Sequence, residues 1–141
     1  MSAFQLAALA RTSEPQSMLR RFLALDAVVT GVNALAYLAF SGPLGRFLGA
    51  DATLLLALGA FLALYAAGVG LLAARRQPPA LGVRAVVEGN LAWAAVSLVA
   101  LVLWLSPSTP GTVWTVLQAL TVAGFGVLQH TALKARQDTS V

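Results

Sequence analysis

One acidic residue lies inside an otherwise apolar stretch, and it is the first candidate for chemistry. Asp26 lies in the apolar run 25–33, and Asn33 follows it by seven residues. Residues seven apart lie on one face of a helix, two turns apart. Ionisable groups inside membrane helices are costly, so they are paired or functional. Asp26 is therefore a candidate acid, base or ligand anchor, with a structural ion pair as the alternative.

A second carboxylate, Glu88, follows Arg84 by four residues. This is the spacing of an ion pair within one helix, although the order with Arg first is the weaker one. Asn90 is two residues beyond Glu88 and so lies on another face. Trp93 follows Asn90 by three residues, which suits the wall of a pocket. For an enzyme, Asp26 and Glu88 are the candidate catalytic groups, and a structural role is the alternative for Glu88 too.

Gln129 and His130 lie near the end of the last apolar run, at a depth that we predict to match that of Asp26, Arg84 and Glu88. These five side chains would form one layer of mixed charge near one membrane surface. The layer either lines a water-filled cavity or is a network that fixes the packing. In such a network Asp26 pairs with Arg84 or reaches back to Arg20 or Arg21 at the interface. For His130 the alternative is a position at the headgroup interface, where a helix C-terminus favours a cation.

Deeper polar residues have a simpler interpretation. Asn33 and Gln118 are predicted to form hydrogen bonds between helices, each contributing about 1 kcal/mol or less. Tyr37 follows Asn33 by four residues, and Tyr65 lies in the second apolar run, so both hydroxyls need partners. The candidate binding residues are therefore Asn33, Tyr37, Arg84, Asn90, Trp93, Gln118, Gln129 and His130.

The composition determines what kind of protein positions these groups. Of the 141 residues, 59% are hydrophobic and only 10% are charged, whereas a soluble domain carries about 25% charged residues. The chain is therefore an integral membrane protein. It has no cysteine and one histidine, which excludes disulfides, thiolate metal sites and multi-histidine metal sites. No metal or other cofactor is predicted.

Four apolar runs divide the chain, over residues 22–40, 53–74, 83–105 and 112–133. Each is close to the roughly 20 residues that cross a bilayer as a helix. Ser13, Glu14 and Pro15 predict the start of the first helix. Residues 1–18 are predicted as a cytoplasmic tail or interfacial helix, 43–51 as a connection with a half-turn, and 134–141 as a cytoplasmic tail. The short loops predict one all-α domain, a four-helix up-down-up-down bundle.

The basic residues predict the orientation. Of nine Lys and Arg residues, only Arg46 lies in an outer loop, and the net charge of +4 gathers at the other ends of the runs. Positive charge marks the cytoplasmic side, so both termini are predicted to be cytoplasmic and no nucleic-acid partner is expected. Trp104 and Trp114 flank the outer loop as an aromatic belt does. The Ala-, Leu-, Val-, Gly- and Arg-rich composition indicates a high-GC bacterial genome, and hence a bacterial inner membrane.

Two short similarities suggest an internal repeat. Residues 26–31 resemble residues 84–89, and residues 67–72 resemble residues 123–128. The two displacements are nearly equal, which predicts two tandem helical hairpins related by an axis along the membrane normal. Asp26 then corresponds to Arg84. The paired glycines at 68 and 70, and at 124 and 126, would mark close contacts between helices, and Gly59 begins a stripe of small residues.

The chain resembles a group of short actinobacterial four-helix integral membrane proteins of unknown function. The resemblance rests on residues 25–31 with Asn33 and Tyr37, on Asn90 with Trp93, and on Trp114 with Gln118 and Gln129, and it covers about residues 18–133. In size and number of spans the chain is also similar to DoxX-like membrane proteins. These resemblances imply an architecture and bring no activity.

Three functions are therefore compared. The first is binding of a lipid, a hydrophobic small molecule or a partner membrane protein, without chemistry. The second is an acid–base enzyme of the isomerase or cyclase type that acts on a hydrophobic substrate inside the membrane. The third is a small-molecule transporter built as a homo-oligomer, because four helices alone enclose little volume.

Overall fold

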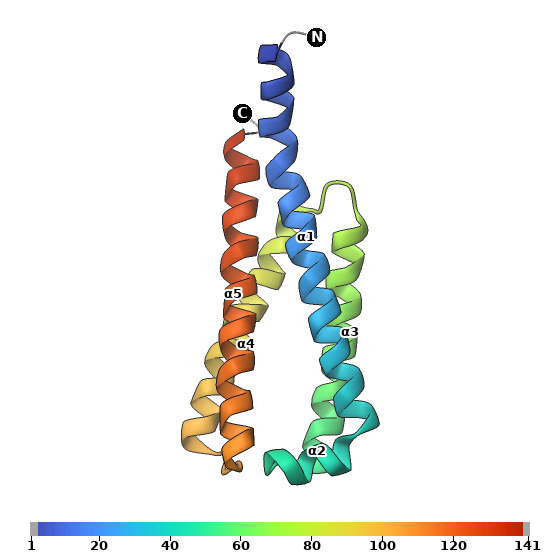
Figure 1. Ribbon diagram of the computed structural model, residues 1–141, viewed down its shortest axis with the longest axis vertical. Helices are drawn as coiled ribbons and strands as arrows, with labels where there is room; N and C mark the ends of the chain where they lie inside the picture. The colour runs from blue at the N-terminus through green and yellow to red at the C-terminus, as the bar shows by residue number, and fades with distance from the viewer. Residues whose placement is uncertain (1–2, 140–141) are drawn as a thin grey trace.

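The computed structural model describes the backbone of residues 3–139 and the side chains of residues 14–138. The elements are α1 (Ala3–Ala39), α2 (Ser41–Leu48), α3 (Ala52–Ala74), α4 (Ala80–Leu103) and α5 (Thr109–Thr139) (Figure 1). Four of these helices contain a stretch long and apolar enough to cross a membrane: Glu14–Ala39, Ala52–Ala74, Ala80–Leu103 and Thr109–Asp138. The all-α architecture with four such helices confirms the predicted fold class.

The helix ends follow local chemistry. Asp51 caps α3, and its carboxylate accepts a hydrogen bond from the Thr53 backbone N–H at 2.8 Å, as N-cap residues do. Gly49 ends α2 with a φ of 69°, a left-handed conformation that favours glycine. Where the sequence predicted a connection over 43–51 with a half-turn, the structure has this longer, eight-residue helix, which begins at Ser41. The predicted helix start at Ser13 is wrong: α1 begins at Ala3 and includes Pro15, although a proline inside a helix leaves one backbone carbonyl without its hydrogen bond.

The four long helices pack as two pairs that are joined along one side only. In Figure 1, α1 with α3 forms one column and α4 with α5 forms the other. Helix α1 also packs along α5, whereas the backbones of α3 and α4 come close to each other at few positions. Two equivalent hairpins related by a twofold axis would make these two contacts equal. The observed contacts are unequal, so the packing does not show this symmetry. The internal repeat stays a prediction from the sequence. The bundle has an opening between α3 and α4.

Small residues allow close packing at some of the predicted positions. A Cβ added at Gly59 would lie 2.9 Å from a Leu38 side-chain carbon, so α3 approaches α1 closely there. A Cβ at Gly126 would lie 3.2 Å from Leu91, on the contact of α5 with α4. The prediction is wrong for Gly68 and Gly124, where an added Cβ would meet nothing within 4 Å.

The end of the bundle near the termini is held together by hydrogen bonds to the last turn of α3 and to the α3–α4 loop. The Arg20 guanidinium donates to the Ala73 carbonyl at 3.1 Å, and the Gln16 amide donates to the Arg76 carbonyl at 2.6 Å. Arg136 donates to the Pro78 carbonyl at 2.7 Å. These bonds satisfy backbone oxygens at a helix end and tie the loop to both α1 and α5.

The opposite end is closed by contact between α2 and the loop before α5. The Ser108 backbone N–H donates to the Leu48 carbonyl at 3.2 Å, and its hydroxyl donates to the Phe47 carbonyl at 2.7 Å. Gly111 lies directly against the Leu48 backbone, where a Cβ has no room. Hydrogen bonds therefore connect the two columns at both ends of the bundle. The middle sections of α3 and α4 lack such connections between their backbones.

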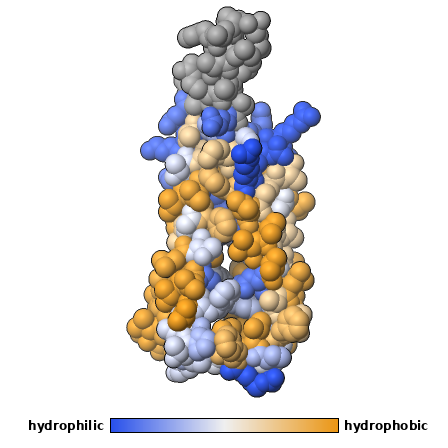
Figure 2. Space-filling view, in the orientation of Figure 1, coloured by the Kyte–Doolittle hydropathy of each residue, from blue (hydrophilic) through white to orange (hydrophobic). Residues whose placement is uncertain are grey.

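The surface pattern fits a membrane environment. Figure 2 shows an apolar surface over the middle of the molecule and hydrophilic residues gathered towards its ends, most of them towards the end of the termini. Large apolar side chains of the long helices are exposed, such as Leu64 on α3 at 77% and Val102 on α4 at 80%. Soluble proteins rarely expose an apolar surface of this extent to water. The face drawn in Figure 2 is also hollowed between the two columns, with hydrophilic groups inside.

Candidate functional site

A buried hydrogen-bond network forms around Asp26, which is only 1% exposed. Its Oδ1 accepts from the Thr30 hydroxyl at 3.0 Å. Its Oδ2 accepts from the side-chain amides of Asn90 and Gln129, each at 2.8 Å. Asn90 is 2% exposed and Gln129 is fully buried. One carboxylate therefore joins α1 to α4 and α5.

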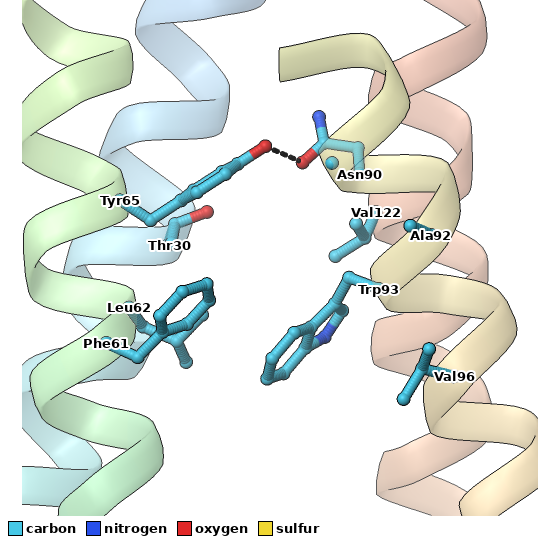
Figure 3. A pocket seen from close by; sticks show the side chains of 10 residues that line it. Thr30, Phe61, Leu62, Tyr65, Asn90, Ala92, Trp93, Val96 and Val122 are labelled. Carbon is cyan, nitrogen blue, oxygen red and sulfur yellow. Dashed lines mark hydrogen bonds between the residues drawn. The ribbon is translucent and has the colours of Figure 1, made fainter. Parts of the chain in front are cut away.

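Tyr65 extends the network to α3. Its hydroxyl donates to Asn90 Oδ1 at 2.8 Å and lies 3.1 Å from the Val86 carbonyl (Figure 3). The Tyr65 hydroxyl lies close to Gly89: a Cβ added at Gly89 would be 3.0 Å from it. A larger residue at position 89 would therefore displace the Tyr65 ring. We call the group of Asp26, Thr30, Tyr65, Asn90 and Gln129 the polar centre.

The carboxylate sets the direction of the other bonds. The Asp26 Oδ2 accepts both bonds, so the amides of Asn90 and Gln129 turn their NH₂ groups towards it. Asn90 uses its second N–H to donate to Gln129 Oε1 at 3.0 Å. Its own Oδ1 is then the acceptor for Tyr65. Among the described side chains, no buried polar atom lacks a partner, as a well-packed interior requires.

A second polar layer lies deeper in the bundle, towards α2. The Trp93 indole N–H donates to Gln118 Oε1 at 2.9 Å, which joins α4 to α5. The Trp114 indole N–H donates to the Tyr37 hydroxyl at 2.7 Å, which joins α5 to α1. This agrees with the predicted interhelical role of Gln118. Asn33 is half-buried on α1 and has no hydrogen bond within these two layers.

Three members of the predicted charged layer lie elsewhere. Arg84, Glu88 and His130 are all exposed, and together with Lys134 they line a surface depression between α4 and α5. We call these four residues the surface group. The predicted Asp26–Arg84 pair is wrong, because Asp26 receives its hydrogen bonds from one hydroxyl and two amides. The predicted single layer is also wrong.

Helix rotation explains this correction. Glu88 is two residues from Asn90 and His130 is one residue from Gln129, which places each about 100–200° around its helix from the buried neighbour. Arg84 is six residues from Asn90, about 240° around. The layer was predicted from depth alone, and depth does not say which side of a helix faces the bundle.

A cavity of about 330 Å³ lies next to the polar centre, in the opening between α3 and α4. We call it the α3–α4 cleft. On one side Phe61 stacks against Trp93, with ring centroids 5.8 Å apart and planes at 12°. Figure 3 shows these rings projecting from the two helices into the cleft, with Tyr65 and Asn90 at one end. The lining residues are Thr30, Phe61, Leu62, Tyr65, Gly89, Asn90, Ala92, Trp93, Val96 and Val122.

The sequence had marked only part of this site. Asn90 and Trp93 line the cleft as predicted from their spacing, while Thr30, Phe61 and Tyr65 were not chosen as site residues. A tyrosine in an apolar helix needs a hydrogen-bond partner, and that requirement was the available indication for Tyr65. Within the described residues, no group of three or more His, Cys, Asp or Glu residues is arranged to hold a metal ion.

Comparison with known proteins gives no relative from which a role for this site could be taken. No family model matches the chain, and neither a curated protein nor a solved structure matches it. The resemblance to short actinobacterial four-helix proteins and to DoxX-like proteins therefore stays a prediction.

Proposed function

We propose that this protein binds a hydrophobic small molecule or lipid in the α3–α4 cleft, without catalysing a reaction. The observation that carries the proposal is the cleft itself, which lies between two membrane-length helices whose backbones come close at few positions. Side chains such as Phe61, Trp93 and Tyr65 reach across between them. Phe61 and Val96 at its edge are 52% and 64% exposed. A ligand would therefore enter sideways from the hydrocarbon. An apolar pocket with a few convergent polar groups is the usual form of a small-molecule site.

The position of the two acidic candidates favours binding over acid–base chemistry. Asp26 is not among the residues that line the cleft, and it is hydrogen-bonded to two that are, Thr30 and Asn90. A general acid or base must come within about 3 Å of the proton it transfers, directly or through one water. Glu88 lies in the surface group, away from the cleft. The enzyme and the oligomeric transporter therefore have less support than simple binding.

The proposal places the protein in a bacterial inner membrane with both termini in the cytoplasm. The two termini and the α3–α4 loop lie at the same end of the molecule (Figure 1), which is where the basic residues gather. An excess of Lys and Arg on one side is the usual mark of the cytoplasmic side.

The test uses a steric block and a matched control on the same helix. Val122 lines the cleft from α5, whereas Val127 is 57% exposed on the outer surface of α5. The full-length protein in lipid nanodiscs is labelled with a long-chain alcohol that carries a photoreactive diazirine. V122W should lower labelling about fivefold or more, because the indole ring takes up space that the ligand would fill and overpacking costs about 1–3 kcal/mol.

V127W adds the same ring outside the cleft and should label like the wild type. The labelled residues should map to α3 and α4 around the cleft. Equal labelling of V122W and the wild type would overturn the proposal. Mass spectrometry of molecules that co-purify with the wild type and are lost from V122W would identify the natural ligand.

A further inference from the structure

The hydrogens at the polar end of the cleft are all used inside the protein. The Thr30 hydroxyl gives its hydrogen to Asp26, and Tyr65 gives its hydrogen to Asn90. Both N–H groups of the Asn90 amide are taken, one by Asp26 and one by Gln129. These three side chains line the cleft, yet none has a hydrogen left to offer a ligand.

Their oxygens, in contrast, keep free acceptor capacity. A hydroxyl oxygen has two lone pairs and an amide oxygen has two. Within the described part of the chain, no donor reaches the Thr30 or Tyr65 hydroxyl oxygens, and Asn90 Oδ1 receives only Tyr65. The polar end of the cleft therefore presents acceptors alone.

This one-sided character originates at Asp26. The carboxylate is an acceptor, so it orients the Thr30 hydroxyl and the Asn90 amide towards itself. The Asn90 oxygen then takes the Tyr65 hydrogen. A chain of hydrogen bonds in a low-dielectric interior is mutually reinforcing, so the orientation at the cleft is set by a group that does not touch it.

We infer that the ligand of the α3–α4 cleft is an apolar molecule whose polar head donates a hydrogen bond, as an alcohol or an ammonium group does. This inference rests on the proposed binding function and specifies its ligand. A hydroxyl or ammonium head can donate a hydrogen bond to these oxygens, which have free lone pairs. The apolar body lies along Phe61, Leu62 and Val96. A ketone or an ether head has an oxygen that only accepts hydrogen bonds. It cannot form a hydrogen bond with the acceptor oxygens of the cleft.

The experiment compares ligands that differ in the head alone. 1-Decanol, 2-decanone and decyl methyl ether compete with the photoreactive alcohol for the wild-type protein in nanodiscs, at equal mole fraction in the membrane. The alcohol should compete about tenfold better than the ketone and the ether, because a buried group without a hydrogen-bond partner loses about that factor. A ketone or ether that competes as well as the alcohol would overturn the inference.

A variant tests where the preference comes from. D26N replaces an acceptor by an amide that both donates and accepts, so Thr30 and Asn90 lose their single orientation. The advantage of 1-decanol over 2-decanone should fall to about threefold or less. An unchanged advantage in folded D26N would contradict the role of Asp26, and the ligand comparison on the wild type stands even if this variant does not fold.

The two proposals fail in distinguishable ways. If V122W labels as strongly as the wild type, the cleft is not the binding site and the proposed function falls. If V122W abolishes labelling while 2-decanone competes as well as 1-decanol, the cleft binds a hydrophobic molecule and only the inference about its head is wrong.

Discussion

The polar centre and the surface group lie side by side in the sequence but differ in almost every physical property. Gln129 is fully buried in the polar centre, and its neighbour His130 is exposed in the surface group. Likewise Asn90 is buried and Glu88, two residues before it, is exposed. The direction in which a side chain leaves its helix, more than its depth along the helix, decides whether it takes part in the network.

The largest effect is expected when the polar centre loses its acceptor. D26A should lower the free energy of unfolding by about 2 kcal/mol or more, because two buried amides and a hydroxyl lose their partner. D26N should have a smaller effect, since an amide oxygen can still accept. Unfolding in SDS, followed by tryptophan fluorescence, measures both. A loss below about 0.5 kcal/mol for D26A would mean that the network contributes no more than an exposed residue.

A smaller effect is expected from the second polar layer. Q118L removes the acceptor of the Trp93 indole N–H and should lower the free energy of unfolding by about 1 kcal/mol, the usual value for a hydrogen bond between membrane helices. A double-mutant cycle of Q118L with W93F should show a coupling of about 0.5–1 kcal/mol. Additive effects in the same unfolding assay would show that this bond contributes nothing.

The smallest effects are expected in the surface group. R84Q and E88Q should each change the free energy of unfolding by less than about 0.5 kcal/mol, and both should leave labelling of the cleft unchanged. R84A combined with D26A should be additive within about 0.5 kcal/mol, because the two side chains share no partner. Rescue of D26A by R84A would instead indicate that Asp26 and Arg84 form an ion pair in the wild type, and it would remove the distinction between the two regions.

Much of the fold was predictable because it depends on local composition. The apolar runs and the prolines and glycines between them are properties of short segments, and each predicted span coincides with one long helix. The α4 helix ends two residues earlier than predicted, at Leu103. The start of α1 was predicted less well, since the helix begins at Ala3 and not at Ser13.

The site was predicted only in part because its geometry involves four helices at once. Asp26, Asn90 and Gln129 were chosen because polar groups are rare in apolar helices, and all three meet in the polar centre. Tyr65 joins them from α3 through a bond across 25 residues of sequence. The rotation of each helix about its axis, which separates Glu88 from Asn90, cannot be taken from spacing within one helix alone.

The sequence by itself determined that the chain forms four membrane-length helices, that its basic residues gather at one end, and that Asp26 needs partners inside an apolar helix. These follow from hydropathy and from the cost of burying charge. The tertiary structure decided that the partners of Asp26 are amides and a hydroxyl, and that α3 and α4 leave a cleft beside them. The reason is that α1 packs against both α3 and α5, which holds the two columns together along one side and leaves the other open.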